Sequence, residues 1–216
     1  MSPATDRDRV LADADVSRET AAALDTYVAQ LRRWQTVKNL VGPGTLAEVW
    51  TRHVADALQL LALAPDARTW VDLGSGAGIP GLILAIAGRG RVGFHVKLVE
   101  SNARKCAFLT ETARLTGAPV TVHNARIEAV VGGFVGADVV CARALAPLTQ
   151  LLAWAEPVLT TGTTGLFPKG RDASLELTEA LRAWTFAGET TPSRTDSEAR
   201  IVRVTSLARR DPAPEP

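Results

Sequence analysis

A glycine-rich segment limits the possible folds more than any other part of this chain. It runs Val71-Asp72-Leu73-Gly74-Ser75-Gly76-Ala77-Gly78-Ile79-Pro80-Gly81. Glycines placed this densely indicate a backbone that turns sharply and lets a ligand approach closely. Pro80 is typical of the first turn of a helix, where its missing N–H group is not needed. The segment therefore predicts a strand, a tight turn and a helix, with a ligand lying across the turn.

Strands and helices alternate around and after this segment. Apolar runs and turn residues predict strands at 69–73, 95–100, 120–123, 137–142, 164–167 and 200–207. Helices are predicted over residues 79–87, 102–116, 148–159 and 172–184. Repeated β-α units of this kind predict an α/β fold with a doubly wound, mostly parallel sheet. The residues that follow each strand are the candidates for binding and catalysis, because ligands bind at that edge of such a sheet.

The N-terminal part of the chain has a different pattern. We expect residues 1–16 to be flexible and residues 17–65 to form a helical cap of two helices. Ser17 is the predicted N-cap of the first helix, and the capping-box pattern from Thr45 to Glu48 predicts the start of the second, which ends near Pro65. Residues 66–208 then form the α/β domain, and residues 209–216 a disordered tail.

Composition excludes several classes of protein. The net charge is +1, so overall charge does not indicate a strongly basic nucleic-acid binder, although a local basic patch remains open. Two cysteines are too few for a disulfide framework, and no Cys/His cluster has the spacing of a metal site. The sequence has no signal-peptide pattern and no apolar run long enough to span a membrane. We therefore expect a cytoplasmic protein with no metal and no membrane contact, and we expect a monomer.

Two acidic residues help to identify the ligand of the glycine turn. The dinucleotide pattern G-x-G-x-x-G matches from Gly76 to Gly81, but alone this match is weak. Asp72 beside the turn repels a pyrophosphate and suits a ligand that carries an ammonium group. Glu100 ends the second strand roughly 20 residues beyond the glycines, the spacing at which an acid accepts hydrogen bonds from ribose hydroxyls. Together they favour S-adenosylmethionine over NAD, with the adenine near Ile127 and Glu128 after the third strand.

The segment after the fourth strand narrows the chemistry. The polar-Pro-Pro-aromatic turn that holds an exocyclic amine is absent, and Cys141 lies inside an apolar strand, which favours a structural thiol over a nucleophile. Arg143 follows this strand and Lys169 ends the next one, and the two cations are candidates to hold an anionic nucleic-acid backbone. A site without an evident base fits guanine N7, whose free lone pair needs no deprotonation. Catalysis there consists mainly of positioning.

The chain resembles the RsmG (also called GidB) methyltransferases. The matching residues occur in the family's order and span roughly residues 30–170; they are Trp34, Asn39-Leu40, Arg52-His53, Asp56, the segment from Asp72 to Gly81, Arg126-Ile127-Glu128, Arg143-Ala144, Leu148 and Lys169-Gly170. The Arg-His-x-x-Asp pattern and the Arg-Ala and Lys-Gly pairs are more specific than the glycine segment. The chain departs from the family's usual residues at Val41, Ala57, Glu100 and Cys141.

This resemblance implies a class I S-adenosylmethionine-dependent methyltransferase with a Rossmann-like, seven-stranded sheet. It also implies methylation of a guanine N7 in bacterial 16S ribosomal RNA, within the small ribosomal subunit. Arg143 and Lys169 are the candidate catalytic residues, and Arg52, His53, Arg143 and Lys169 are expected to face the RNA. The complete set expected to bind the cofactor is Asp72, Gly74, Gly76, Gly78, Ile79, Glu100, Ile127, Glu128 and Arg143. The alternatives are an NAD-type oxidoreductase and a non-catalytic assembly factor that binds ribosomal RNA.

Overall fold

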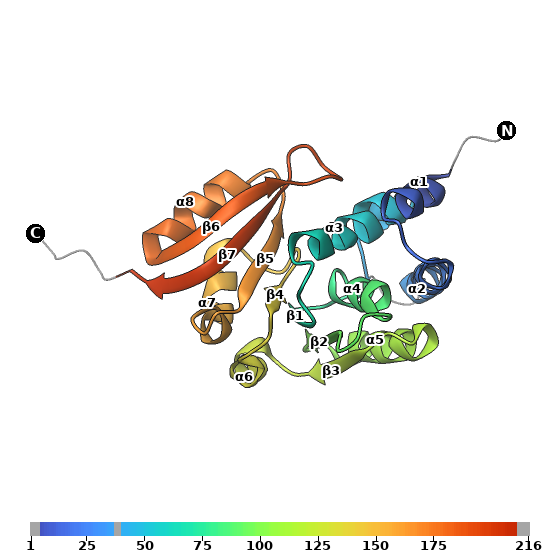
Figure 1. The fold of residues 1–216 in the computed structure, drawn as a ribbon, viewed down its shortest axis with the longest axis horizontal. Coiled ribbons are helices and arrows are strands. Elements are labelled where there is room, and N and C mark those ends of the chain that lie inside the picture. The colour runs from blue at the N-terminus through green and yellow to red at the C-terminus, as the bar shows by residue number, and fades with distance from the viewer. Residues whose placement is uncertain (1–4, 37–39, 211–216) are drawn as a thin grey trace, which may run out of the picture.

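A single seven-stranded sheet forms the centre of the protein (Figure 1). The computed structural model describes residues 5–36 and 40–210. The strands lie in the order β3-β2-β1-β4-β5-β7-β6. Their bounds are β1 Thr69–Leu73, β2 His95–Glu100, β3 Val120–Asn124, β4 Val139–Cys141, β5 Thr164–Lys169, β6 Trp184–Pro192 and β7 Arg200–Arg209. The first five strands are parallel, whereas β7 is antiparallel to both β5 and β6. The structure thus confirms the predicted mostly parallel α/β sheet.

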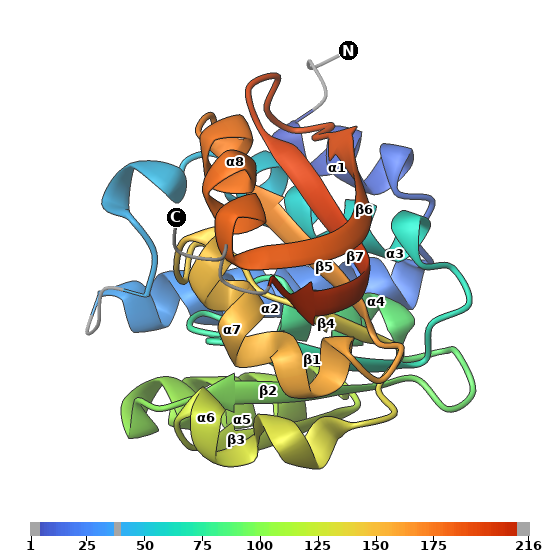
Figure 2. The same cartoon turned by 90° about the vertical axis from the view of Figure 1, so that its left-hand side faces the viewer.

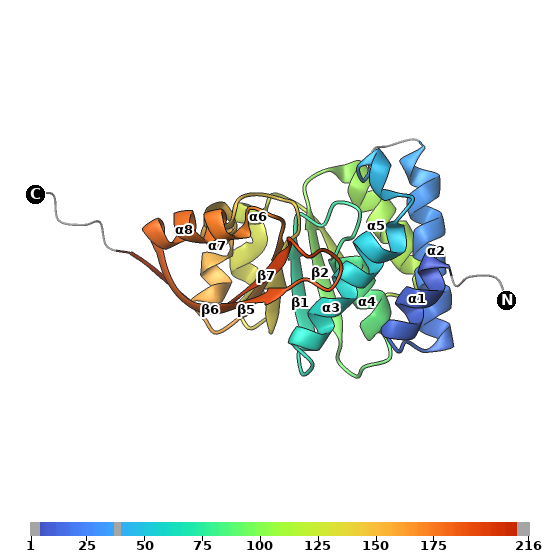
Figure 3. The same ribbon diagram turned by 90° about the horizontal axis from the view of Figure 1, so that it is seen from above.

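Helices cover both faces of the sheet (Figure 3). One face carries α3 (Asp56–Leu63), α4 (Gly81–Gly88) and α5 (Ala103–Thr116), with α1 (Asp6–Asp13) and α2 (Arg18–Gln35) packed outside them. The other face carries α6 (Ile127–Val130), the 3₁₀ turn η3 (Val131–Phe134), α7 (Leu148–Leu159) and α8 (Ala173–Ala183), and α8 lies beside α7 (Figure 2). Neighbouring residues of β1 divide between the two cores, since Trp70 packs in the first and Val71 in the second. Both faces of the sheet are therefore buried, as parallel strands require.

Several elements form where the sequence predicts them. β1 and β2 have the predicted bounds. The Ser17 hydroxyl accepts a hydrogen bond from the backbone N–H of Thr20 and caps α2. Asn102 caps α5 in the same way, and Gly117 ends that helix in the left-handed conformation.

Other elements differ from the prediction. Residues 5–16, expected to be flexible, contain α1, because Thr5 and Asp8 form a capping box. No such box forms at Thr45, whose hydroxyl instead donates to the carbonyl of Gly42 at 2.7 Å. The chain there makes a 3₁₀ turn, η1 (Pro43–Thr45), and the next helix begins only at η2 (Trp50–Ala55), a π-helix that continues into α3.

Strand β6 is absent from the prediction because its residues lack an apolar alternation. Most of its side chains are exposed, since β6 is the edge strand and pairs only with β7. The predicted tail over residues 209–216 and the matching residue Asn39 lie outside the described residues, apart from the first two positions of the tail. None of the described helices is long and apolar enough to cross a membrane.

The chain order of the strands reverses between β1 and β4. From β1 the chain moves outward to β2 and β3, and then returns to β4 on the other side. The loops that leave β1 and β4 therefore diverge, and they leave a crevice at the carboxyl edge of the sheet. The glycine segment and Arg143 follow these two strands and lie at this crevice.

Candidate functional site

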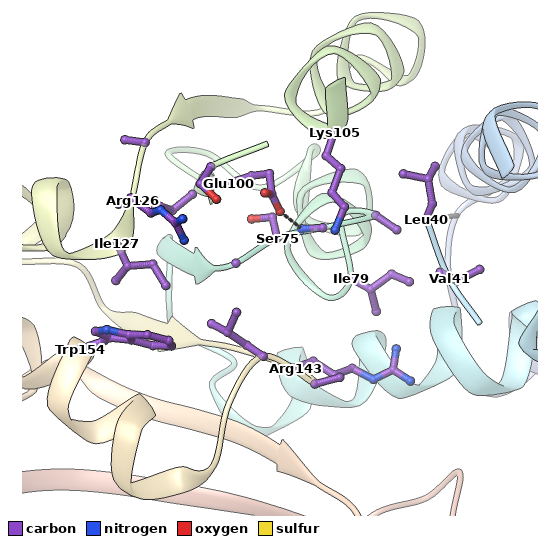
Figure 4. A pocket seen from close by; sticks show the side chains of 18 of the residues that line it. Leu40, Val41, Ser75, Ile79, Glu100, Lys105, Arg126, Ile127, Arg143 and Trp154 are labelled. Carbon is purple, nitrogen blue, oxygen red and sulfur yellow. Dashed lines mark hydrogen bonds between the residues drawn. The ribbon is translucent and has the colours of Figure 1, made fainter. Parts of the chain in front are cut away.

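A cavity of about 540 Å³ lies above the glycine segment at the carboxyl edge of the sheet (Figure 4). Its walls come from the glycine turn, the end of β2, the loop before α6, the segment after β4 and residues 40–42 before η1. The lining residues are Leu40, Val41, Gly42, Thr45, His53, Gly74, Ser75, Gly76, Ala77, Ile79, Val99, Glu100, Ser101, Lys105, Ala125, Arg126, Ile127, Glu128, Arg143, Ala144, Leu145 and Trp154. Its volume is in the range of small-molecule and cofactor sites.

The glycine turn presents backbone to this cavity. Gly74 and Gly76 have φ values of +68° and +54°, which residues with a side chain adopt at a cost. A Cβ atom at Gly74 would lie 2.5 Å from Leu145 Cδ1, whereas one at Gly76 would meet only the Gly74 carbonyl oxygen, at 3.7 Å. Gly74 thus allows the start of the glycine turn to contact Leu145 in the segment after β4. Gly76 leaves the cavity floor open.

Glu100 is held at the edge of the cavity by two backbone groups. Its Oε2 accepts a hydrogen bond from Gly76 N at 3.0 Å, and its Oε1 accepts one from Asn102 N at 2.7 Å. The residue is buried apart from this edge. Each carboxylate oxygen has a further lone pair. The fixed carboxylate can therefore accept hydrogen bonds from the two hydroxyls of a ribose.

The structure corrects the prediction for Asp72. Its carboxylate does not line the cavity; the side chain is fully buried on the face of β1 that packs against α4. Oδ2 accepts a hydrogen bond from Gly81 N at 3.1 Å, and a Cβ atom at position 81 would lie 2.5 Å from it. Burial raises the pKa of Asp72 to about 7, although hydrogen bonds from neighbouring groups lower it. Asp72 therefore anchors the start of α4 instead of facing a ligand.

Gly78 is the other predicted cofactor residue that does not line the cavity. A Cβ atom there would lie 2.6 Å from the Cβ atom of Leu82, so this glycine allows the turn to pack against α4. The remaining predicted residues do line it, namely Gly74, Gly76, Ile79, Glu100, Ile127, Glu128 and Arg143.

The helical cap supports the cavity directly. The hydroxyl of buried Tyr27 in α2 donates to the carbonyl of Ala77 at 3.0 Å. At the end of the same helix, Gln35 Oε1 accepts hydrogen bonds from the backbone N–H groups of Leu40 and Val41. These bonds place Leu40 and Val41 on the cavity wall. The helical cap therefore contributes directly to the site.

Sequence reasoning missed several lining residues. Trp154 reaches the cavity from α7 and Lys105 from the first turn of α5 (Figure 4). Lys105 could have been predicted to line the cavity from its place in the chain, five residues after the acid that ends β2. Trp154 lies on a helix with many apolar residues, and its pattern does not separate it from core residues.

Arg143 connects the segment after β4 to the helical cap. Its Nε lies 2.9 Å from Asp56 Oδ2, and its Nη2 donates to the carbonyl of Arg52 at 2.9 Å. Its Nη1 lies 3.0 Å from His53 Nδ1. Asp56 Oδ1 accepts two more hydrogen bonds, from Gln59 Nε2 and Thr195 Oγ1, both at 2.9 Å. The guanidinium is therefore held in place, and its charge is balanced by a carboxylate.

The tautomer of His53 follows from its neighbours. Thr45 Oγ1 uses its own hydrogen for the Gly42 carbonyl, so it accepts from His53 Nε2 at 3.0 Å. The proton is thus on Nε2, and Nδ1 accepts from Arg143 Nη1. The Arg52 carbonyl oxygen, also 3.0 Å from Nδ1, takes its hydrogen bond from Arg143 Nη2 instead. Burial, together with the positive charge of Arg143, lowers the pKa of His53 to about 4. A neutral His53 is required for the contact with Arg143.

A second cavity, of about 520 Å³, adjoins the first. The two cavities share Arg143, Ala144 and Leu145 as a common wall. Arg52 and Lys169 both line the second cavity, so the structure brings these predicted RNA-facing residues together with Arg143, whereas His53 lines the first. Lys169 is not a free cation, however. Its Nζ lies 2.7 Å from Glu176 Oε2 and donates to the carbonyl of Ala146 at 2.7 Å.

Cys141 is not placed to act as a nucleophile. The side chain is fully buried in β4, and burial beside Asp72 raises the pKa of its thiol. The described residues also contain no group of three or more His, Cys, Asp and Glu side chains placed to hold a metal ion.

Comparisons with known proteins give matches over most of the chain. The family model for GidB, rRNA small subunit methyltransferase G, matches residues 20–201. A protein of Methylorubrum populi named ribosomal RNA small subunit methyltransferase G is 80% identical over 95% of this chain and 98% of its own. One of the same name from Methylorubrum extorquens is 76% identical over the same shares.

Solved structures resemble the chain in fold. The ribosomal protein L11 methylase from Lactobacillus delbrueckii subsp. bulgaricus superposes with a TM-score of 0.53 and 18% identity, covering 74% of this chain and 79% of its own. At this identity the match shows the methyltransferase fold alone.

Proposed function

Because this chain belongs to the rRNA small subunit methyltransferase G family, we propose that it transfers a methyl group from S-adenosylmethionine to N7 of a guanine in 16S ribosomal RNA. The observation that carries the proposal is the pair of cavities that share one wall at the carboxyl edge of the sheet. A donor in one cavity and an acceptor base in the other meet at Arg143, Ala144 and Leu145.

The residues of the first cavity suit S-adenosylmethionine. The fixed carboxylate of Glu100 is placed to accept from ribose hydroxyls. Ile79, Ile127 and Leu145 supply apolar contacts for an adenine and for the atoms around the sulfur. The open backbone at Gly76 allows close approach of the ligand. When bound, the cofactor supplies an electrophilic methyl group on a positively charged sulfur.

The electrostatics of the shared wall fit this donor. An unpaired guanidinium beside a sulfonium would repel it. Arg143 is instead paired with Asp56 at 2.9 Å, and its other nitrogens bind a neutral imidazole and a carbonyl. We therefore assign Arg143 a positioning role: it fixes the wall against which the methyl group and the base are aligned.

The chemical step needs no base from the protein. The N7 lone pair of guanine forms the new N–C bond as the C–S bond breaks, and no proton is transferred. The purine gains the positive charge that the sulfur loses. The chain contributes alignment of the two reactants and exclusion of water between them. This agrees with the absence of a candidate base among the side chains of the shared wall.

The proposal extends to the setting of the reaction. The substrate is the 16S ribosomal RNA within the small ribosomal subunit, and the enzyme acts as a monomer in the cytoplasm. Arg52, whose side chain is about half exposed at the edge of the second cavity, is a candidate for contact with a phosphate.

Two measurements test the function. Titration calorimetry should detect binding of S-adenosylhomocysteine and none of NAD, and the reverse result would favour a dinucleotide enzyme. Incubation with tritiated S-adenosylmethionine should label small subunits from cells that lack the enzyme. RNA binding without any cofactor binding would instead indicate a non-catalytic assembly factor.

A further inference from the structure

The second cavity contains a polar pair that the function so far leaves unused. Lys169 ends β5, and Glu176 projects from α8, which lies beside α7. We propose that this cavity is the pocket for the target base and that Glu176 selects guanine by accepting hydrogen bonds from its N1–H and 2-amino groups. This inference rests on the proposed function and names the residue that reads its substrate.

The pair has unused hydrogen-bonding capacity. Lys169 Nζ has three N–H groups, of which one binds Ala146 O and one binds Glu176 Oε2. Glu176 Oε2 also accepts from Leu148 N at 2.6 Å. Among the described residues, Oε1 has no hydrogen-bond donor within reach, and a quarter of the Glu176 side chain is exposed. One N–H donor of Lys169 and both lone pairs of Glu176 Oε1 are therefore available side by side.

This order of groups matches the edge of guanine. Along the base, N7 is followed by O6, an acceptor, and then by N1–H and the 2-amino group, which are donors. If N7 faces the wall shared with the first cavity, the next group along the base is O6, which needs a donor. N1–H follows it and needs an acceptor. Lys169 supplies the donor and Glu176 the acceptor. Adenine presents the opposite order, an amino group and then an unprotonated N1, and so meets like groups.

The rest of the cavity suits a base taken out of a stacked strand. Pro147, Pro168 and Leu145 offer apolar surface for the faces of the ring. Thr195, in the loop between β6 and β7, also lines the cavity and is fixed through its hydrogen bond to Asp56. An enzyme that acts on one base must hold it away from its neighbours. The cavity therefore has walls for the ring and polar groups for its edge.

Glu176→Gln changes this edge with little change in shape. The carbonyl oxygen of the new amide can still accept from Leu148 N, but its NH₂ group then presents donors where N1–H of guanine must bind. Glu179→Gln is the matched control, because Glu179 lies on the same helix and pairs with Arg182 at the exposed surface. A purely structural role of Glu176 would lower activity on every substrate equally.

The experiment compares small subunits reconstituted with guanosine or inosine at the target position. Inosine has N7, O6 and N1–H but lacks the 2-amino group. We expect the wild-type enzyme to prefer guanosine by about 10-fold or more in kcat/KM. Glu176→Gln should lose most of this preference and keep its affinity for S-adenosylhomocysteine, and Glu179→Gln should behave as the wild type does.

Equal rates on guanosine and inosine by the wild-type enzyme would overturn the inference, even if the variant fails to fold. A preference that persists in Glu176→Gln would also overturn it. Either result leaves the proposed function intact, because methyl transfer to guanosine still occurs. No transfer by the wild-type enzyme to either substrate would refute the function itself and this inference with it.

Discussion

Asp56→Asn should separate the helical cap from the segment after β4. Three donors converge on the two oxygens of Asp56, from Arg143, Gln59 and Thr195, each at 2.9 Å. An asparagine offers one oxygen and one NH₂ group, so at least one of these donors meets another donor. The side chains of Asp56 and Arg143 are only 12% and 22% exposed, which makes the loss costly.

The expected loss of stability can be estimated from the cost of leaving one of these donors without its acceptor. Hydrogen bonds to charged groups contribute about 1.5–3 kcal/mol each. Removing one partner of a buried ion pair costs about 3–5 kcal/mol, and the partial exposure of Arg143 reduces this figure. We therefore expect the free energy of unfolding to fall by about 3 kcal/mol. Asp25→Asn is the control, because the Arg7–Asp25 pair has two 2.6 Å contacts but is 38% and 42% exposed, and should contribute less than about 1 kcal/mol.

Urea unfolding of a double-mutant cycle tests this reasoning. The four proteins are the wild type, Asp56→Asn, Arg143→Met and the double variant. We expect a coupling energy of about 1.5 kcal/mol or more between the two positions. A coupling energy below about 0.5 kcal/mol would refute the account of Arg143 as a residue held by the cap.

Three further predictions concern the first cavity and its supports. Gly76→Arg should abolish the calorimetric signal for S-adenosylhomocysteine, because an arginine side chain at this position extends into the open cavity. Gly76→Ala should keep most of the binding. Asp72→Asn should keep cofactor binding, since the side chain lies behind the turn. Because the native pKa of Asp72, about 7, is above its unfolded value, ionisation of Asp72 weakens the native state as pH rises from about 4 to 7. Asp72→Asn should lack this pH dependence in urea unfolding. Loss of cofactor binding in the variant would contradict the placement of Asp72 behind the turn. His53 has a native pKa of about 4, below its unfolded value, so its neutral form stabilises the fold above about pH 6.5. Up to about 3 kcal/mol of this stabilisation should be lost as pH falls toward 4, and His53→Asn should lack that decline.

The sequence predicts the parts of the fold that local chemistry determines. Asn102 and Gly117 mark the two ends of α5, and apolar runs mark β1 and β2. The prediction fails at Thr45, where a hydrogen bond to Gly42 and contact with His53 replace the expected cap. It also fails for the edge strand β6, whose exposed residues carry no apolar alternation. In both cases packing against distant residues decides the local structure.

The site shows the same division. Glu100, Gly74 and Gly76 lie at the cavity as their order in the chain predicts. Asp72 does not, because two-residue alternation places it on the same face of β1 as Trp70, and α4 covers that face. Asp56 and His53 both contact Arg143, although His53 and Arg143 are 90 residues apart in the sequence. Only the folded chain reveals these contacts. The role of Glu176 likewise depends on where α8 packs.

The most direct test of the central claim is to identify the methylated atom. Small subunits from cells that lack the enzyme are incubated with S-adenosylmethionine and the purified protein, and the 16S ribosomal RNA is then reduced and cleaved with aniline, which breaks the chain at N7-methylguanine. We predict one new cleavage site that requires both the protein and the cofactor. Methyl incorporation without any such cleavage would contradict the assignment of guanine N7 as the acceptor.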